Sequence, residues 1–172
     1  MSNSKILSVF DFDDTLAKCD CLIYVMRDGE VVNKLTPSQY AIYELQEGED
    51  FSYEEFNKLI KNPIIIKENF RLLVKQLDKA RRSARGSRKV TILTARGLSL
   101  PVTDFFKKLG LKPYVVALCS ADPMDKANWI EEQINKGYTT IYFMDDSEKN
   151  INAVNEMLKK YPDVISEVAL IK

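Results

Sequence analysis

The chain has 172 residues, a hydrophobic fraction of 45%, and 25 basic and 25 acidic side chains. The resulting formal net charge of zero gives no whole-chain basicity that would indicate binding to nucleic acid or to an anionic membrane. There is no histidine, which excludes Ser-His-Asp triads, Cys-His pairs and zinc sites with histidine ligands.

The cysteines and the apolar runs bear on the compartment. The three cysteines are Cys19, Cys21 and Cys119, and an odd number disfavours a disulfide framework. Residues 1–5 are polar and unlike a targeting sequence. No apolar run approaches the ~20 residues that a membrane span needs. We therefore expect a cytoplasmic protein with reduced thiols and no membrane partner.

The stretch at residues 9–16, Val-Phe-Asp-Phe-Asp-Asp-Thr-Leu, carries the first chemical signal. The apolar run over 6–10 predicts a buried strand, and Asp11, Asp13 and Asp14 follow it at once. Carboxylates crowded at the end of a buried strand repel one another and lose hydration, a cost that a divalent cation offsets. Oxygen ligands without histidine or cysteine suit Mg²⁺. A solvated acidic turn is the alternative interpretation.

An insertion at about residues 20–66 is predicted to follow this strand. Two β-prone runs, 22–26 and 30–35, flank an Asp-Gly turn at 28–29, which predicts a hairpin. We expect a helix over about 38–46 and a second short helix, capped by Ser52, over 51–56. The segment is rich in aromatic residues, which we interpret as packing against the main body; a platform for stacking a ligand is the alternative.

Strands and helices are predicted to alternate along the rest of the chain. Helices are expected at about 67–84, 100–109, 125–136 and 148–160, and strands at 89–93, 114–118, 140–144 and 168–171. This alternation indicates an α/β, Rossmann-like doubly wound fold, with a parallel sheet and helices on both faces. A basic run at 79–89 is interpreted as a solvated helix end, or alternatively as a contact for nucleic acid.

The polar residues that follow the predicted strands indicate a site. In an open parallel sheet, ligands bind at the carboxyl ends of the strands. The side chains expected at that edge are Asp11, Asp13, Thr94, Lys126, Asp145 and Asp146. Phosphoryl transfer through a carboxylate nucleophile fits this set. Asp11 would attack phosphorus, and Asp13 would protonate the leaving oxygen and then accept a proton from water.

The remaining side chains of the set have expected roles in charge stabilisation. Mg²⁺ would be held by Asp11, Asp145 and Asp146, where it would reduce the repulsion between carboxylate and phosphate. The hydroxyl of Thr94 and the backbone N–H groups beside it would hold a phosphoryl oxygen. Lys126 would place a fixed positive charge on the developing anion.

These motifs resemble those of the haloacid dehalogenase (HAD) superfamily, phosphatase branch. The family's first motif, DxDx[TS], matches residues 11–15, and its second, a Thr or Ser after an apolar strand, matches Thr94. Its third motif matches Lys126, and its fourth, a carboxylate pair, matches residues 145–146. Asn150 falls where DDxxxN variants place an asparagine. All four occur in family order and span residues 11–150.

The resemblance implies a Mg²⁺-dependent phosphatase in a single HAD-like domain over residues 1–172. Asp13 marks the phosphatases and phosphotransferases, because dehalogenases lack this acid–base residue. The hairpin at 22–35 would be a flap over the site, and the insertion at 20–66 a small cap. The implied metal ligands are Asp11, the backbone carbonyl of Asp13, Asp145 and Asp146, and the implied phosphate contacts are Thr94, Ala95, Arg96 and Lys126.

The sequence leaves the substrate open between two branches. One is a small metabolite such as a nucleotide or a sugar phosphate, and the other is a phosphorylated nucleic-acid end, which the basic run and the small cap slightly favour. Two further alternatives are a HAD-like phosphotransferase and a non-catalytic scaffold or binding module. Family members with small caps also borrow a neighbouring subunit as a lid, and no oligomeric state follows from the sequence.

Overall fold

Five parallel strands form the centre of the structure, a computed structural model that describes residues 4–172. The strands are β1 (Ile6–Phe10), β7 (Arg88–Thr94), β8 (Tyr114–Ala117), β9 (Thr140–Asp145) and β10 (Ile165–Leu170), in the order β10-β9-β1-β7-β8. β1 pairs with β7 on one side and with β9 on the other. The strand that leads into the first carboxylates is therefore the central one, and its apolar residues are buried.

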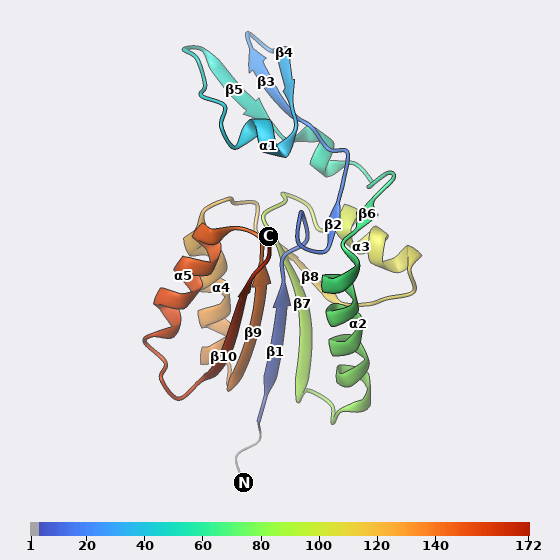
Figure 1. Cartoon of the computed structure of the whole chain (residues 1–172), viewed down its shortest axis with the longest axis vertical. Coiled ribbons are helices and arrows are strands. Elements are labelled where there is room, and N and C mark those ends of the chain that lie inside the picture. The colour runs from blue at the N-terminus through green and yellow to red at the C-terminus, as the bar shows by residue number, and fades with distance from the viewer. Residues whose placement is uncertain (1–3) are drawn as a thin grey trace.

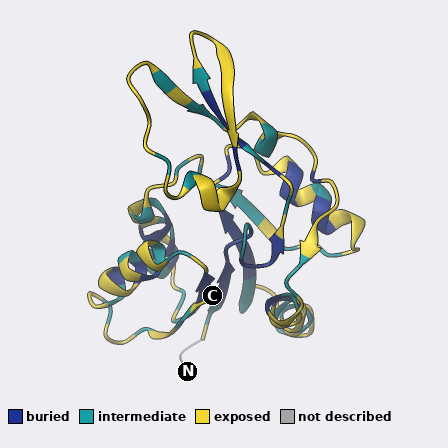
Figure 2. Ribbon diagram, turned by 45° about the horizontal axis from the view of Figure 1, so that its top comes forward, coloured by how far each residue is buried: buried dark blue, intermediate teal, exposed yellow. Residues whose placement is uncertain are grey.

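Helices cover both faces of this sheet, as the alternating pattern predicts (Figure 1). On one face, α2 (Lys67–Arg82) and α3 (Leu100–Lys108) pack against the side of β1 that carries Phe10. On the other, α4 (Pro123–Asn135) and α5 (Glu148–Leu158) pack against the side that carries Val9. Successive strand residues point to opposite faces, so the two faces of β1 belong to two separate cores. The interior of the sheet is accordingly the most buried part of the chain (Figure 2).

The segment between β1 and α2 projects beyond the carboxyl ends of the strands (Figure 1). Its stalk is an antiparallel pair of two-residue strands, β2 (Ala17–Lys18) and β6 (Ile64–Ile65). Residues 20–66, here called the cap, include β6 of the stalk and, above it, β3 (Ile23–Arg27), β4 (Glu30–Leu35), α1 (Pro37–Tyr40), β5 (Glu49–Ser52) and the 3₁₀ helix η1 (Glu54–Asn57). The three longer strands form an antiparallel sheet in the order β4-β3-β5.

The structure confirms the hairpin but corrects the two cap helices. β3 and β4 pair around Asp28 and Gly29, which both have positive φ. The helix expected over 38–46 is wrong beyond α1, which ends at Tyr40. The helix expected over 51–56 is also wrong, since residues 49–52 are a strand paired with β3 and only 54–57 form a 3₁₀ turn. Tertiary pairing, which places Phe51 opposite Val25, here outweighs the local capping signal.

The aromatic residues pack mainly within the cap. Tyr40, Tyr43 and Phe51 surround the buried Val25 and Leu35 in a small core separate from the two cores of the sheet. The ring centroids of Tyr40 and Phe51 lie 4.8 Å apart, in an edge-to-face arrangement that aromatic pairs favour. The expectation that these rings pack against the main body is therefore wrong for this trio.

Element boundaries in the core differ little from the predicted ones. α4 starts at Pro123, two residues earlier than expected, because Asp122 caps it by accepting a hydrogen bond from the Met124 N–H. β10 starts at Ile165 rather than at residue 168. It is an edge strand, and its first three residues are exposed, so its apolar pattern covers only the second half.

Two expectations from the sequence concern the cysteines and membrane-spanning helices. All three cysteines are free thiols. Across residues 4–172, none of the helices combines the length and the apolar character needed to cross a membrane.

Candidate active site

The carboxyl ends of the strands bring the predicted residues to one edge of the sheet. Asp11 directly follows β1, Thr94 is the last residue of β7, and Asp145 is the last residue of β9. Lys126 lies near the start of α4. The cap stands over this edge (Figure 1). Side chains that are more than 80 residues apart in the sequence therefore share one site.

Three carboxylates form what is here called the carboxylate cluster: Asp11, Asp145 and Asp146. One oxygen from each lies within 4.8 Å of the others. Asp11 and Asp145 are buried, whereas Asp146 is exposed at the rim. Burial raises the pKa of Asp11 well above its ordinary value, and the charges of Asp145 and Asp146 raise it further. An ionised cluster of this kind needs compensating positive charge.

Lys126 supplies part of that charge. Its Nζ donates to Oδ1 of Asp11 at 2.8 Å and to Oδ2 of Asp145 at 2.8 Å. The lysine side chain is itself buried. Burial alone would lower the pKa of Lys126, but the two carboxylates outweigh it and raise that pKa to about 12. The ammonium is therefore fixed, charged and shared between the strands that carry Asp11 and Asp145.

Thr15 connects the other sides of Asp11 and Asp146. Its Oγ1 lies 3.0 Å from Oδ2 of Asp11 and 3.2 Å from Oδ1 of Asp146. A hydroxyl has a single proton and can donate to only one of these oxygens at a time. The backbone carbonyl of Thr15 accepts a 2.8 Å hydrogen bond from Nδ2 of the buried Asn69 in α2. Sequence reasoning missed Asn69, because nothing local marks a helix residue that holds a loop 54 positions earlier.

Asp145 is held by three donors. Besides Lys126, the backbone N–H of Ser147 donates to Oδ1 at 2.8 Å, and Nδ2 of Asn150 donates to Oδ2 at 3.0 Å. Ser147 also caps α5 by accepting from the N–H of Asn150. Buried carboxylates are tolerated when their lone pairs are satisfied in this way. The asparagine that the sequence pattern singled out thus contacts the carboxylate of its own motif.

Asp13 is paired with Arg96. Nε of Arg96 donates to Oδ2 of Asp13 at 2.9 Å, and Nη2 donates to Oδ1 at 2.7 Å. Nη1 donates to the Phe56 carbonyl of the cap at 3.0 Å. The guanidinium carbon also lies 5.6 Å from the ring centroid of Phe12 and 5.0 Å from that of Phe56. Arg96 was expected to contact phosphate; its guanidinium here joins Asp13 to the cap.

The loop after β7 positions the remaining predicted phosphate contacts. Oγ1 of Thr94 accepts a 3.2 Å hydrogen bond from the backbone N–H of Arg96, so the hydroxyl proton of Thr94 remains available to another acceptor. Ala95 is exposed between these two residues. The Thr94 carbonyl accepts from the Leu118 N–H, which holds the loop against the end of β8.

The carboxylate cluster fits a hard divalent cation. The ligand atoms that the cluster offers are all carboxylate oxygens. The Thr15 hydroxyl can donate to only one of its two neighbouring oxygens, so the other, on Asp11 or on Asp146, does not receive that proton and can face a cation. Mg²⁺ takes oxygen ligands and is commonly held by one or two carboxylates. The cluster is therefore a candidate metal site.

The chain matches no protein-family model, no curated protein and no solved structure.

A cavity of about 780 Å³, here called the cap cavity, lies between the cap and the core beside Asp13. From the cap it is lined by η1 and by aromatic residues that include Tyr40 and Tyr53. From the core it is lined by Asp13 and Asp14, by the loop after β7 and by the loop after β8. Asp13 thus connects this cavity to the site at the tip of β1.

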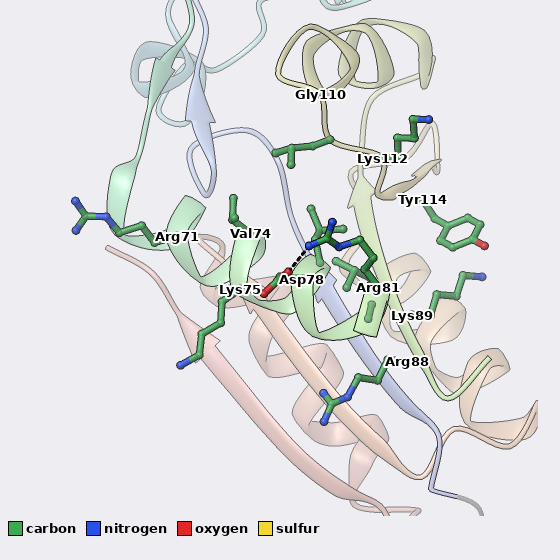
Figure 3. Close-up of a pocket in the computed structure, with 14 residues that line it drawn as sticks. Arg71, Val74, Lys75, Asp78, Arg81, Arg88, Lys89, Gly110, Lys112 and Tyr114 are labelled. Atoms are coloured by element: carbon green, nitrogen blue, oxygen red, sulfur yellow. Dashed lines mark hydrogen bonds and ion pairs between the residues drawn. The ribbon is translucent and has the colours of Figure 1, made fainter. Parts of the chain in front are cut away.

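A second cavity, of about 720 Å³, lies between α2 and strands β7 and β8 (Figure 3). Its lining includes six basic side chains: Arg71, Lys75, Arg81, Arg88, Lys89 and Lys112. Arg81 is paired with Asp78, and Lys89 lies over the ring of Tyr114 at 4.6 Å. Because Arg88 and Lys89 begin β7, this basic cavity reaches the amino edge of the sheet, opposite the carboxylate cluster. Part of the basic run at 79–89 therefore lies far from Asp11.

Proposed function

We propose that this protein is a Mg²⁺-dependent phosphatase of the HAD type, which hydrolyses a phosphomonoester through an aspartyl phosphate on Asp11. The observation that carries the proposal is the position of Asp11, at the tip of the central strand, bonded to Lys126 and next to Asp145 and Asp146. Three of the four motifs that resemble the HAD superfamily supply these residues, and the parallel sheet with helices on both faces is compatible with that fold.

In the first step, a carboxylate oxygen of Asp11 attacks the phosphorus of the substrate. A bond forms between this oxygen and phosphorus while the bond from phosphorus to the leaving-group oxygen breaks. Asp13, when protonated, gives its proton to that oxygen and the alcohol leaves. In the second step, water attacks the phosphorus of the aspartyl phosphate, Asp13 takes its proton, and inorganic phosphate and free Asp11 result.

Two fixed groups would stabilise the transferring phosphoryl group. Lys126 holds a full positive charge beside Asp11, where the phosphoryl oxygens would lie. The Thr94 hydroxyl, with its proton available, would donate to one of those oxygens. A Mg²⁺ ion held by Asp11, Asp145 and Asp146, when bound, supplies the charge that lets a carboxylate approach an anionic phosphate.

The pairing with Arg96 occupies both carboxylate oxygens of Asp13, which accept from Nε and Nη2 of the guanidinium. To donate a proton to the leaving group, Asp13 must first separate from Arg96. Because Arg96 also bonds to the Phe56 carbonyl, a movement of the cap would shift this pair. The cap is thus proposed to couple substrate entry to the release of Asp13 from Arg96.

A panel of phosphomonoesters tests the proposal directly. The purified chain is assayed for phosphate release with Mg²⁺ and with a chelator, on sugar phosphates, nucleotides and 3′- and 5′-phosphorylated oligonucleotides. We expect metal-dependent release from at least one class and none from the Asp11→Asn variant. Trapping a labelled phosphoryl group on the protein, and its loss in that variant, would identify the nucleophile. A panel without any metal-dependent turnover contradicts the proposal and favours a non-catalytic module.

A further inference from the structure

The cap cavity carries information about the leaving group of the proposed reaction. Its volume of about 780 Å³ lies within the ~300–1,000 Å³ typical of small-molecule sites. It begins at Asp13, the residue proposed to protonate the leaving oxygen, and extends under the cap. A substrate whose phosphoryl group lies at Asp11 would therefore project its leaving group into this cavity.

The cap side of the cavity presents aromatic rings. Tyr40, Phe51, Tyr53 and Phe56 all line it. Tyr53 is 46% exposed, although its hydroxyl is held by the Tyr40 hydroxyl at 2.8 Å. The ring centroids of Tyr40 and Tyr53 lie 6.0 Å apart at 84°, so the rings form two walls at nearly a right angle. An exposed ring in a fixed orientation is a surface on which a planar aromatic group stacks.

The charges around the cavity disfavour a second phosphate. Among residues 4–172, Arg96 is the one basic side chain in its lining, and this side chain is 2% exposed and bonded to Asp13 and the Phe56 carbonyl. Asp14 and Glu54 add negative charge. A nucleic-acid strand needs a basic groove along its backbone, and the basic cavity reaches the opposite edge of the sheet. The lining of the cap cavity therefore favours a leaving group that is planar, aromatic and free of further phosphate.

We propose that the cap cavity binds the nucleobase of a nucleoside monophosphate, with Tyr53 as the residue on which the base stacks. This inference rests on the proposed phosphatase activity and narrows its substrate to mononucleotides. Sugar phosphates lack the base, and phosphorylated oligonucleotides add a polyanionic strand for which the cavity has no free cation.

Matched substrates test this specificity. The rates for nucleoside 3′- and 5′-monophosphates are measured first. The isomer that is hydrolysed faster is then compared with ribose 5-phosphate and with an oligonucleotide that carries the same terminal nucleotide. We expect kcat/KM for the mononucleotide to exceed that for ribose phosphate at least about tenfold, since stacking on one ring supplies a factor of this size. Equal values for these two substrates overturn the inference, and a faster oligonucleotide overturns it in favour of nucleic-acid ends.

Variants at Tyr53 separate stacking from a structural role of this residue. Tyr53→Leu should lower the ratio of mononucleotide to ribose phosphate kcat/KM about tenfold. Tyr53→Phe removes the hydrogen bond to Tyr40 but keeps the ring, and should keep the ratio. Tyr114→Leu, at an exposed ring of the basic cavity, is the matched control and should also keep it. A ratio unchanged in Tyr53→Leu overturns the assignment of the base to this ring.

Binding of an unphosphorylated nucleoside distinguishes failure of this inference from failure of the proposed function. We expect calorimetry to detect the nucleoside on the wild-type protein without metal, and more weakly on Tyr53→Leu. Nucleoside binding without hydrolysis of any phosphomonoester would leave the cavity assignment standing and refute the phosphatase. Hydrolysis without nucleoside binding or base preference would do the reverse.

Discussion

Both carboxylate oxygens of Asp13 accept hydrogen bonds from the guanidinium of Arg96, at 2.9 Å from Nε and 2.7 Å from Nη2. The same guanidinium donates to the Phe56 carbonyl and contacts the faces of the Phe12 and Phe56 rings. A bidentate pair of this kind is stronger and more directional than a single ion pair. One arginine therefore fixes the proposed acid–base residue and one end of the cap together.

Arg96→Lys should destabilise the protein by about 2 kcal/mol, because an ammonium cannot reproduce the fork to Asp13 and also reach Phe56. Urea unfolding measures the change. The control is Arg81→Lys, whose side chain is 80% exposed and pairs with Asp78 on the surface; it should stay within about 0.5 kcal/mol of the wild type. Equal effects of the two substitutions would mean that the Arg96 fork contributes nothing to the fold.

Asp11→Asn should abolish turnover without loss of stability. Burial and two neighbouring carboxylates raise the pKa of Asp11, so its ionised form is costly in the folded state. A neutral amide removes that cost, while Lys126 keeps its bond to Asp145. We expect an unchanged or higher Tm in the absence of metal, together with undetectable phosphate release. A folded variant that still hydrolyses substrate would show that another residue is the nucleophile.

Lys126→Met should destabilise the metal-free protein by about 3–5 kcal/mol, since it leaves the buried Asp11 and Asp145 without their shared ammonium. Millimolar Mg²⁺ should then raise Tm more in the variant than in the wild type, because a cation bound only to the folded state stabilises it. Lys160→Met, which removes a surface pair with Glu131, is the control. Equal Mg²⁺ shifts in all three proteins would place the cation elsewhere.

Glu55 should make the cap sensitive to acid. The hydroxyl of Tyr24 and, at 2.6 Å, the backbone N–H of Leu22 donate to its carboxylate and lower the pKa of Glu55. A lowered carboxyl pKa stabilises the fold above the ordinary value of about 4.3, and this contribution is lost as the pH falls through the folded-state pKa.

The Glu55→Gln variant should therefore lose less stability than the wild type between about pH 6 and about pH 3. The urea midpoint at each pH measures this difference. Glu54→Gln, a change at the exposed neighbouring residue, is the matched control and should follow the wild type. Parallel curves for the wild type and Glu55→Gln would exclude Glu55 as a source of acid sensitivity.

The parallel sheet and the residues at the carboxyl ends of its strands could be predicted, because the sequence pattern that marks each strand is local. Apolar runs mark β1, β7 and β9, and a polar residue ends or follows each run, so the rules for parallel sheets alone bring Asp11, Thr94 and Asp145 together. Lys126 followed from its place near the start of a helix on the same edge.

The parts that sequence reasoning missed depend on distant partners. The two-residue strands of the stalk are too short to show any periodicity, and β5 is a strand because it pairs with β3. The pairing of Arg96 with Asp13 joins residues 83 positions apart through one choice of rotamers. A motif places the backbone of such residues, but side-chain partners are set by the packing around them.

Asp145→Asn should weaken the metal dependence of the proposed reaction while the fold persists. Asparagine can still accept from the Ser147 N–H, but it offers a neutral oxygen where Mg²⁺ prefers a charged one. We expect the Mg²⁺ concentration for half-maximal activity to rise at least about tenfold, the effect of losing ~1.4 kcal/mol of binding free energy. Asp163→Asn, at an exposed residue outside the site, is the control. A metal titration that coincides with the wild type would remove Asp145 from the ligand set and, with it, the reason for placing a cation between β1 and β9.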